Sequence, residues 1–291
     1  MENIPDPVSF DQALDKFLSH LTTQKRSSAT SIAYGSDLSQ LKDHMAGKRI
    51  TQATTIQTEH LQDYVNHLFS KNYTPKSISR KINSLKTFFR YLHTEKIVTA
   101  NPAESLAHPH YDSKPPRILT KEEYKSLRDA VRLDIRISAV VELLLQTGMR
   151  ISELANLRID DFKKNEVFVR SLENNPARTI TLGKGAATAV QNYLSLRPEV
   201  KDDHLFVTKT GRPLLIRNIR TSVDRYFKKA GLKGTKVNDL RHTFIAHQLK
   251  AGVHPETIYK HVGHKRLSST QKYLEHIEIK EEATLTRIIE L

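Results

Sequence analysis

A polar stretch between Asn101 and Pro116 divides this chain into two parts. It contains several prolines and histidines but few apolar residues, which is the composition of a linker. The segment that starts at Thr120 then has the pattern of a capping box, which opens a new helix. We therefore expect two domains, residues 1–113 and residues 114–291, in a chain long enough to bury two cores.

The first part has the periodicity of short amphipathic helices. Apolar residues recur at helical spacing in four segments, which polar stretches separate. This pattern predicts a small four-helix bundle. The core positions that it indicates are Phe10, Leu14, Phe17, Leu18 and Leu21, then Ile32, Leu38 and Leu41, then Leu61, Tyr64, Val65 and Leu68, and finally Ile78, Ile82, Leu85, Phe88, Phe89 and Leu92.

The fourth of these helices carries polar residues off its apolar face, namely Lys76, Arg80, Ser84 and Lys86. Cations mixed with small hydroxyl groups suit close approach to a DNA backbone or groove. A solvated helix face explains the same pattern, so both interpretations stay open at this point.

In the second part, the apolar run Val140 to Leu145 leads into Thr147 and Gly148. The pattern predicts a buried helix that ends at the glycine and a second helix that begins just after it, capped by Ser152 or a nearby residue. Arg150 would lie at the junction. Further on, alternating residues predict a β-hairpin from Glu166 to Leu182. The expected fold is mainly α with a small β-hairpin or sheet.

Groups that suit phosphate chemistry gather near the C-terminus: Arg241 and His242 in a run that begins at Asn238, then His264, then Tyr273. An arginine stays charged and donates two parallel hydrogen bonds to phosphate oxygens. A histidine can move a proton near neutral pH. A tyrosine hydroxyl is a nucleophile once a base or nearby cations activate it, since its ordinary pKa is near 10.

Each of these residues also has an ordinary structural interpretation. An arginine near a helix end, such as Arg150, is commonly a surface or capping cation, and a tyrosine such as Tyr273 is commonly part of a core or an interface. The several histidines near the C-terminus suggest a metal site. The chain has no cysteine and no His-Glu-x-x-His pattern, so we expect no metal.

Four motif pieces in order are more specific than any one of them. Thr147 to Leu154 read Thr-Gly-Met-Arg-Ile-Ser-Glu-Leu, Leu240 begins Leu-Arg-His, Gly263 begins Gly-His, and Tyr273 follows. In this order and at these separations the pieces resemble the tyrosine recombinase (phage integrase) family, and the compact length resembles its Xer-type members. The resemblance covers nearly the whole chain. It implies a helical N-terminal core-binding (SAM-like) domain and a catalytic domain that close around DNA as a C-shaped clamp.

The resemblance also implies a role for each matched residue. Arg150 and Arg241 would clamp the scissile phosphate, and His264 would hydrogen-bond it and help to stabilise the transition state. Tyr273 would be the nucleophile that forms a 3′-phosphotyrosine link, without a cofactor. His242 follows the second arginine as in the usual motif, and we expect it to support the site from behind.

The chain departs from the family pattern at two places. Asn238 stands where the motif usually has a histidine, and an asparagine can donate a hydrogen bond but cannot shuttle a proton. Glu173 falls where the family places a catalytic lysine in the hairpin. The lysines nearby are Lys163 and Lys164, before the first strand, and Lys184, after the second, so the catalytic lysine stays unassigned.

The expected activity is site-specific DNA recombination, as in Xer-type dimer resolution or in integration, excision and resolution of mobile elements. Two alternatives stay open. One is a nicking and closing enzyme that resembles type IB topoisomerases. The other is a DNA-binding accessory protein on a recombinase fold with weakened catalysis, although the retention of both arginines, His264 and Tyr273 argues against it.

The charge of the chain agrees with a DNA partner. The net charge is +14 with an isoelectric point near 9.7, and residues 1–113 account for only +2 of it. No apolar segment long enough for a membrane helix and no signal peptide are evident, so we expect a cytoplasmic protein.

The expected assembly is a homotetramer on a specific DNA site, formed from protein that is monomeric in solution. A second recombinase or an accessory protein is a further candidate partner. The apolar tail, which includes Ile277, Leu285 and Ile288, is expected to pack into a neighbouring subunit.

Overall fold

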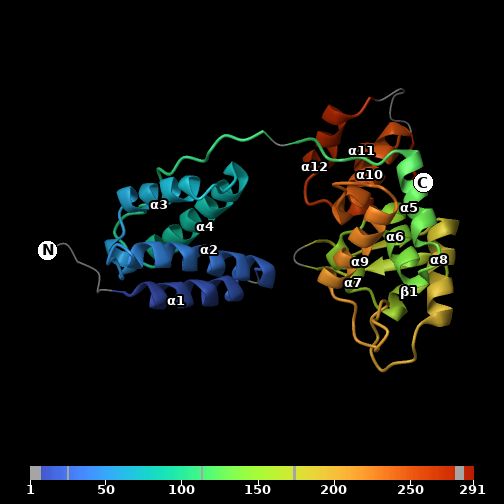
Figure 1. Cartoon of the computed structure of the whole chain (residues 1–291), viewed down its shortest axis with the longest axis horizontal. Helices are drawn as coiled ribbons and strands as arrows, with labels where there is room; N and C mark the ends of the chain where they lie inside the picture. The colour runs from blue at the N-terminus through green and yellow to red at the C-terminus, as the bar shows by residue number, and fades with distance from the viewer. Residues whose placement is uncertain (1–7, 25, 113, 173–174, 279–284) are drawn as a thin grey trace. The chain divides into compact units, whose positions relative to one another are not determined.

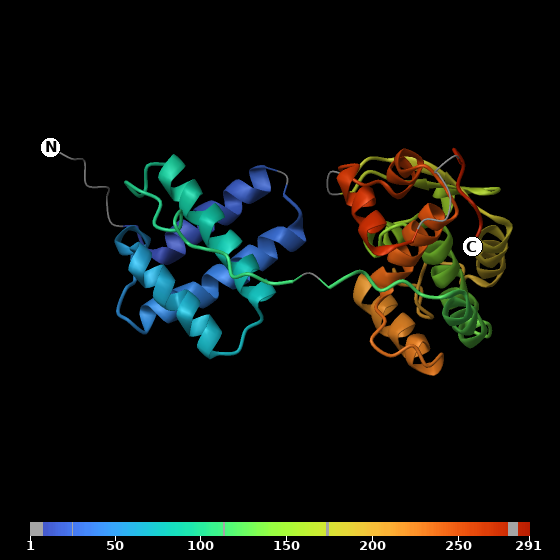
Figure 2. The same cartoon turned by 90° about the horizontal axis from the view of Figure 1, so that it is seen from above.

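The computed structural model describes residues 8–24, 26–112, 114–172, 175–278 and 285–291. The chain divides into two compact units, Met1–Ser113 and Lys114–Leu291 (Figures 1 and 2). Each unit has its own hydrophobic core. The predicted mainly helical fold with one small sheet is confirmed. Among the described residues, no helix is both long and apolar enough to cross a membrane.

The first unit contains the four predicted helices: α1 (Phe10–Thr23), α2 (Ser28–Ala46), α3 (Thr58–Ser70) and α4 (Pro75–Thr94). A short 3-10 helix, η1 (Ala53–Thr55), precedes α3. The side chain of Thr74 caps α4, and Pro75 occupies the first turn, where its missing N–H costs nothing. Ile32, which the periodicity placed in the core, is instead 71% exposed.

A buried carboxylate, Asp37 of α2, ties α2 to α4. It accepts hydrogen bonds from Arg80, from the ammonium group of Lys81 at 2.9 Å and from the hydroxyl of Ser84 at 2.8 Å. Ser84 is 0% exposed, so its predicted contact with DNA is corrected: the hydroxyl serves the core. Lys76 and Arg80 lie on the exposed face of α4, whereas Lys86 is half-buried.

Replacing Asp37 with asparagine is expected to destabilise the first unit by about 3 kcal/mol, because Lys81, 2% exposed, would keep its charge without a carboxylate. Urea denaturation followed by circular dichroism measures the change. Asp11→Asn is the matched control, since Asp11 pairs with Lys42 at the surface. Equal stability of the two variants would show that the buried ion pairs do not hold this unit together.

The second unit is built around α6 (Ile135–Thr147), which packs against α8 (Lys184–Leu196) and α10 (Val237–Lys250). α6 is buried along most of its length, as the apolar run predicts. The remaining elements are α5 (Lys121–Val131), α7 (Ile151–Ala155), η2 (Ile159–Asp161), α9 (Ile216–Lys229), α11 (Pro255–Val262), α12 (Ser268–Gln271) and η3 (Lys272–His276).

The predicted hairpin forms two strands of an antiparallel sheet in the order β1-β2-β3. β2 (Glu166–Val169) pairs with β3 (Arg178–Thr181), with Val167 opposite Ile180, and β1 (Phe162–Lys163) adds a short edge strand. Val167 and Ile180 face the core of this unit. Glu173, at the position expected for the catalytic lysine, lies outside the described residues.

The C-terminal segment, residues 285–291, packs on its own unit and ends beside α5 (Figure 1). Gln248 exchanges two hydrogen bonds with the backbone of Ile289, and Gln146 exchanges two with that of Leu291. The described part of the tail thus has partners in its own unit, although the sequence led us to expect a partner in a neighbouring subunit. Docking into a neighbouring subunit would first require these bonds to break.

Candidate active site

The C-terminal end of α6 holds the side chain of Arg241 in place. Gly148 has a φ of 60°, which ends the helix in the left-handed conformation, and a Cβ there would lie 2.5 Å from the ring of Phe244. The carbonyl of Gly148 accepts a 2.5 Å hydrogen bond from Nη1 of Arg241. The same Nη1 donates to the carbonyl of Val262 at 2.9 Å, near the end of α11. Two helix C-termini, which carry partial negative charge, thus hold one buried guanidinium.

Arg150 lies at the junction between α6 and α7, as predicted, and is itself the N-cap residue of α7. The carboxylate of Glu153 accepts from the backbone N–H of Arg150 at 2.8 Å and from its Nη1 at 2.9 Å, so Glu153, and not Ser152, completes this cap. Nη2 donates to the carbonyl of Gly263 at 2.9 Å. Gly263 ends α11 with a φ of 63°.

A third arginine, Arg178 of β3, belongs to the same group and was missed in the sequence. It donates to the carbonyl of His261 at 2.6 Å and pairs with Glu153 at 2.9 Å. Strand alternation places Arg178 on the inward face with Ile180, two residues later, and this was the available signal. Glu153 was also missed as a site residue, although it stands three positions after Arg150.

The electrostatic balance of this cluster favours an anion. The guanidinium groups of Arg150 and Arg178 both pair with the carboxylate of Glu153, and that of Arg241 lies close enough to feel the charge of the same carboxylate. Burial, and then the charge of Arg150, lower the pKa of Arg241 to about 9, so it remains a cation at neutral pH. Its buried Nη2 has no hydrogen-bond partner among the described residues. A phosphate oxygen would supply the missing acceptor.

His264 follows Gly263, the residue that ends α11, and lies near these arginines. Its Nδ1 is 2.7 Å from the hydroxyl of Thr270, a residue that is 0% exposed. Burial, followed by the charges of Arg241 and Arg150, lowers the pKa of His264 to about 3. The ring is therefore neutral at physiological pH, and a hydroxyl that donates to Nδ1 places the ring proton on Nε2, ready for an acceptor.

Tyr273 of η3 is 9% exposed, and its hydroxyl lies 2.5 Å from Nδ1 of His242. Burial raises the pKa of Tyr273 to about 12, while the charge of Arg241 acts in the opposite direction. Nε2 of His242 lies 2.7 Å from the amide nitrogen of Asn238. The expectation that His242 supports the site from behind is thus corrected, because the ring contacts the tyrosine hydroxyl itself.

Two half-buried histidines of this unit predict acid-sensitive folding. Burial, and then Arg178, lower the pKa of His261 to about 4, and that of His264 is about 3, against an ordinary value near 6.5. As the pH falls below 6.5, these histidines gain protons in the unfolded chain but not yet in the folded chain. The free energy of unfolding therefore falls below this pH and keeps its full value above it. We expect the unit to lose about 2–4 kcal/mol between pH 7.5 and pH 5.0 in urea denaturation. His261→Gln should flatten the dependence, and equal midpoints at both pH values would contradict it.

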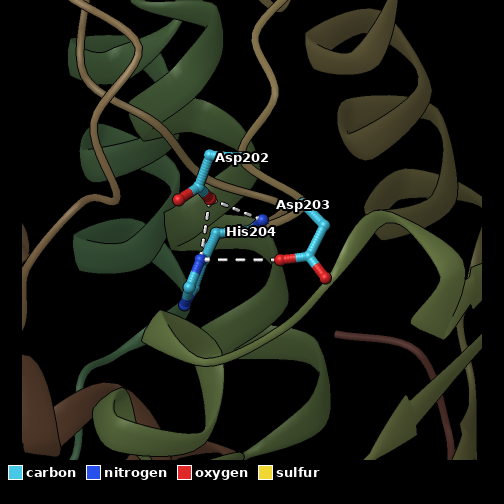
Figure 3. A group of neighbouring side chains, drawn as sticks. All are labelled: Asp202, Asp203 and His204. Carbon is cyan, nitrogen blue, oxygen red and sulfur yellow. Dashed lines mark hydrogen bonds and ion pairs between the residues drawn. The ribbon is translucent and has the colours of Figure 1, made fainter.

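A cluster of Asp202, Asp203 and His204 lies on the loop that leads to Leu205 (Figure 3). The ring of His204 bonds Asp202 at 2.7 Å, and Asp203 pairs with Arg158. The backbone of the loop bonds that of the segment after α7, as in the 2.7 Å bond from Leu205 to Leu157. Because the hydrogen bonds of these side chains are made to one another and to Arg158, we interpret the cluster as one that stabilises the loop. We assign no ligand to it.

The lysines near the hairpin take different places. Lys163 is in β1 and Lys164 follows it in a turn with a φ of 56°. Lys184 is the first residue of α8 and lines a cavity with Arg128 and Leu291. None of these positions assigns the catalytic lysine.

Comparison with known proteins shows the family to which this fold belongs. The family model "Phage integrase family" matches residues 117–278, and the model "Phage integrase, N-terminal SAM-like domain" matches residues 14–96. The chain belongs to the phage integrase family. The predicted activity, site-specific recombination by the tyrosine recombinase mechanism, and the expected Xer-like character are thereby confirmed.

The recombinase has relatives along nearly its whole length. Tyrosine recombinase XerC of Staphylococcus carnosus is 33% identical over 73% of this chain and 75% of its own length. A Tn1549 transposon integrase in complex with a circular intermediate DNA has a TM-score of 0.76 at 19% identity, over 91% of this chain and 94% of its own. A lambda integrase tetramer bound to a Holliday junction has a TM-score of 0.72 at 17% identity, over 89% and 78%. The two solved structures share the fold.

Proposed function

We propose that Tyr273 is the nucleophile of this recombinase and that Arg150, Arg241 and His264 bind the scissile phosphate. The observation that carries the proposal is the buried Nη2 of Arg241, which lacks an acceptor in a cluster of three guanidinium groups around one carboxylate. The cluster lies near Tyr273, since Arg241 and His242 are neighbours on α10 and His242 bonds the tyrosine hydroxyl. Hydrogen-bond donors fixed in advance around a phosphate stabilise the charge of its transition state.

The reaction proceeds by two phosphoryl transfers. The Tyr273 oxygen attacks the phosphorus, the bond to the 5′ oxygen breaks, and a 3′-phosphotyrosine link and a 5′ hydroxyl result. The tyrosine proton leaves to a base, and the departing 5′ oxygen gains a proton. The 5′ hydroxyl of a partner strand then attacks the link and releases the tyrosine. Because the covalent link conserves the energy of the broken bond, the exchange requires no nucleotide hydrolysis.

We propose that the first unit also contacts DNA. Lys76 and Arg80 are exposed on α4, and Asp37 holds the guanidinium of Arg80 while about half of that side chain stays exposed. Cations at fixed positions suit contacts to the DNA backbone, which fix the register of a protein on the duplex. The Tn1549 transposon integrase named above is in complex with DNA, and the lambda integrase is a tetramer bound to a Holliday junction. We propose that this chain also binds DNA and forms a tetramer on it, and that it acts in the cytoplasm.

The test uses a nicked duplex that carries a candidate recombination site, in a buffer with EDTA, and a denaturing gel. The wild-type protein should form a covalent adduct, and Tyr273→Phe should bind the same DNA without forming one. Tight, salt-sensitive binding without any adduct would support the accessory DNA-binding alternative. An adduct that reseals without a paired site, and never exchanges strands, would support the nicking and closing alternative.

A further inference from the structure

Asn238, His242 and Tyr273 form a continuous chain of hydrogen-bonding groups. Asn238 and His242 are four residues apart on α10, so their side chains lie on the same face of the helix. The amide of Asn238 is 2.7 Å from Nε2 of His242, and Nδ1 of His242 is 2.5 Å from the Tyr273 hydroxyl. The two ring nitrogens thus connect the amide to the atom that must lose a proton.

The surroundings keep the His242 ring neutral. Burial lowers the pKa of His242, and the charge of Arg241 acts in the same direction, whereas that of Asp239 opposes it. His264 faces the ring from the segment after α11 but is itself bonded to Thr270. A neutral imidazole with one nitrogen on the tyrosine hydroxyl can accept a proton, which a charged ring cannot do.

The orientation of the Asn238 amide sets the tautomer of His242. With the amide nitrogen on Nε2, that ring nitrogen accepts, the ring proton lies on Nδ1, and Nδ1 donates to Tyr273. A half-turn of the amide presents its oxygen to Nε2 instead. The ring proton then lies on Nε2, and Nδ1 becomes the acceptor for the tyrosine proton. Asn238 is exposed, so the amide can turn without disturbing the core.

We propose that His242 is the general base that takes the proton of Tyr273, and that Asn238 is the positioning residue that sets its tautomer. The inference rests on the proposed function, in which Tyr273 is the nucleophile. As the Tyr273 oxygen attacks phosphorus, its proton moves to Nδ1 of His242, and Nε2–H donates to the Asn238 amide oxygen. The pair supplies the acid/base function that an asparagine at the usual histidine position cannot supply alone. A histidine held by an amide in this way also serves the cysteine nucleophile of papain-like proteases.

Single-turnover cleavage of the nicked duplex by the full chain tests the base. We expect His242→Ala to cleave about 100-fold to 1000-fold more slowly with unchanged DNA affinity, and added imidazole to restore part of the rate. The rate of the variant should continue to rise with pH as hydroxide replaces the missing base. His276→Gln is the control, because His276 is exposed and lies three residues from Tyr273.

Two substitutions test the positioning residue. Asn238→Asp offers only acceptor oxygens to Nε2, so cleavage should equal or exceed that of the wild type. Asn238→Leu should be about 10-fold slower, because nothing then orients the ring. Cleavage by Asn238→Asp that is slower than by Asn238→Leu would overturn the role of Asn238.

Different results would overturn the role of His242 and the role of Tyr273. A Tyr273-dependent adduct together with wild-type cleavage by His242→Ala would overturn the base and leave the nucleophile intact. Adduct formation by Tyr273→Phe would overturn the proposed function itself.

Discussion

Arg241→Lys is expected to lower the rate of DNA cleavage by about 100-fold to 1000-fold. In the structure one nitrogen of Arg241 bonds two helix-terminal carbonyls while another stays available for an oxyanion. A lysine ammonium is a single point that cannot occupy both places. Single-turnover adduct formation on the nicked duplex measures the loss.

DNA affinity should change little in this variant, because most binding energy comes from contacts to the backbone of the whole duplex. Arg132→Lys, an exposed arginine that follows α5, is the control and should cleave at the wild-type rate. Cleavage by Arg241→Lys within a few fold of the wild type would show that the buried guanidinium does not bind the reacting phosphate.

Glu153→Gln is expected to abolish cleavage and to destabilise the second unit by about 3 kcal/mol or more. Glu153 is 3% exposed, and burial is the largest single influence on its pKa and acts to raise it. The hydrogen bond and charge of Arg178, and then those of Arg150, together outweigh this influence and lower the pKa. Without its charge, three guanidinium groups would repel one another in a buried space. Thermal unfolding measures the loss of stability, and the nicked duplex measures the loss of cleavage.

An added anion gives this prediction a second readout. Inorganic phosphate should raise the melting temperature of Glu153→Gln more than that of the wild type, because it replaces the missing negative charge. Glu256→Gln, at an exposed position in the first turn of α11, is the control. Equal effects of phosphate on the Glu153 and Glu256 variants would contradict the electrostatic account.

Local patterns in the sequence predicted most of the fold. Helical periodicity located α1 to α4, and the apolar run before Gly148 located the end of α6, because both signals depend on neighbouring residues alone. The exposure of Ile32 and the burial of Ser84 were not predictable in this way. Both depend on how α2 meets its neighbours, and Asp37 reaches Ser84 across 47 positions of the chain.

The sequence indicated the candidate site residues that belong to recognisable motifs. It did not indicate those whose residue type is equally common on ordinary protein surfaces. Arg150, Arg241, His264 and Tyr273 stood out through their motifs, and the structure brings them near one another. Arg178 looked like a strand cation, yet it meets Glu153 across 25 positions and the carbonyl of His261 across 83. Such contacts follow from tertiary packing, and a single sequence does not specify them.

Identification of the residue that becomes attached to DNA tests the central claim most directly. The adduct from the nicked duplex would be digested with protease and nuclease, and the nucleotide-bearing peptide sequenced by mass spectrometry. We expect a 3′-phosphate on Tyr273 and a free 5′ hydroxyl on the released strand. Attachment to another residue, or a 5′-linked adduct, would contradict it.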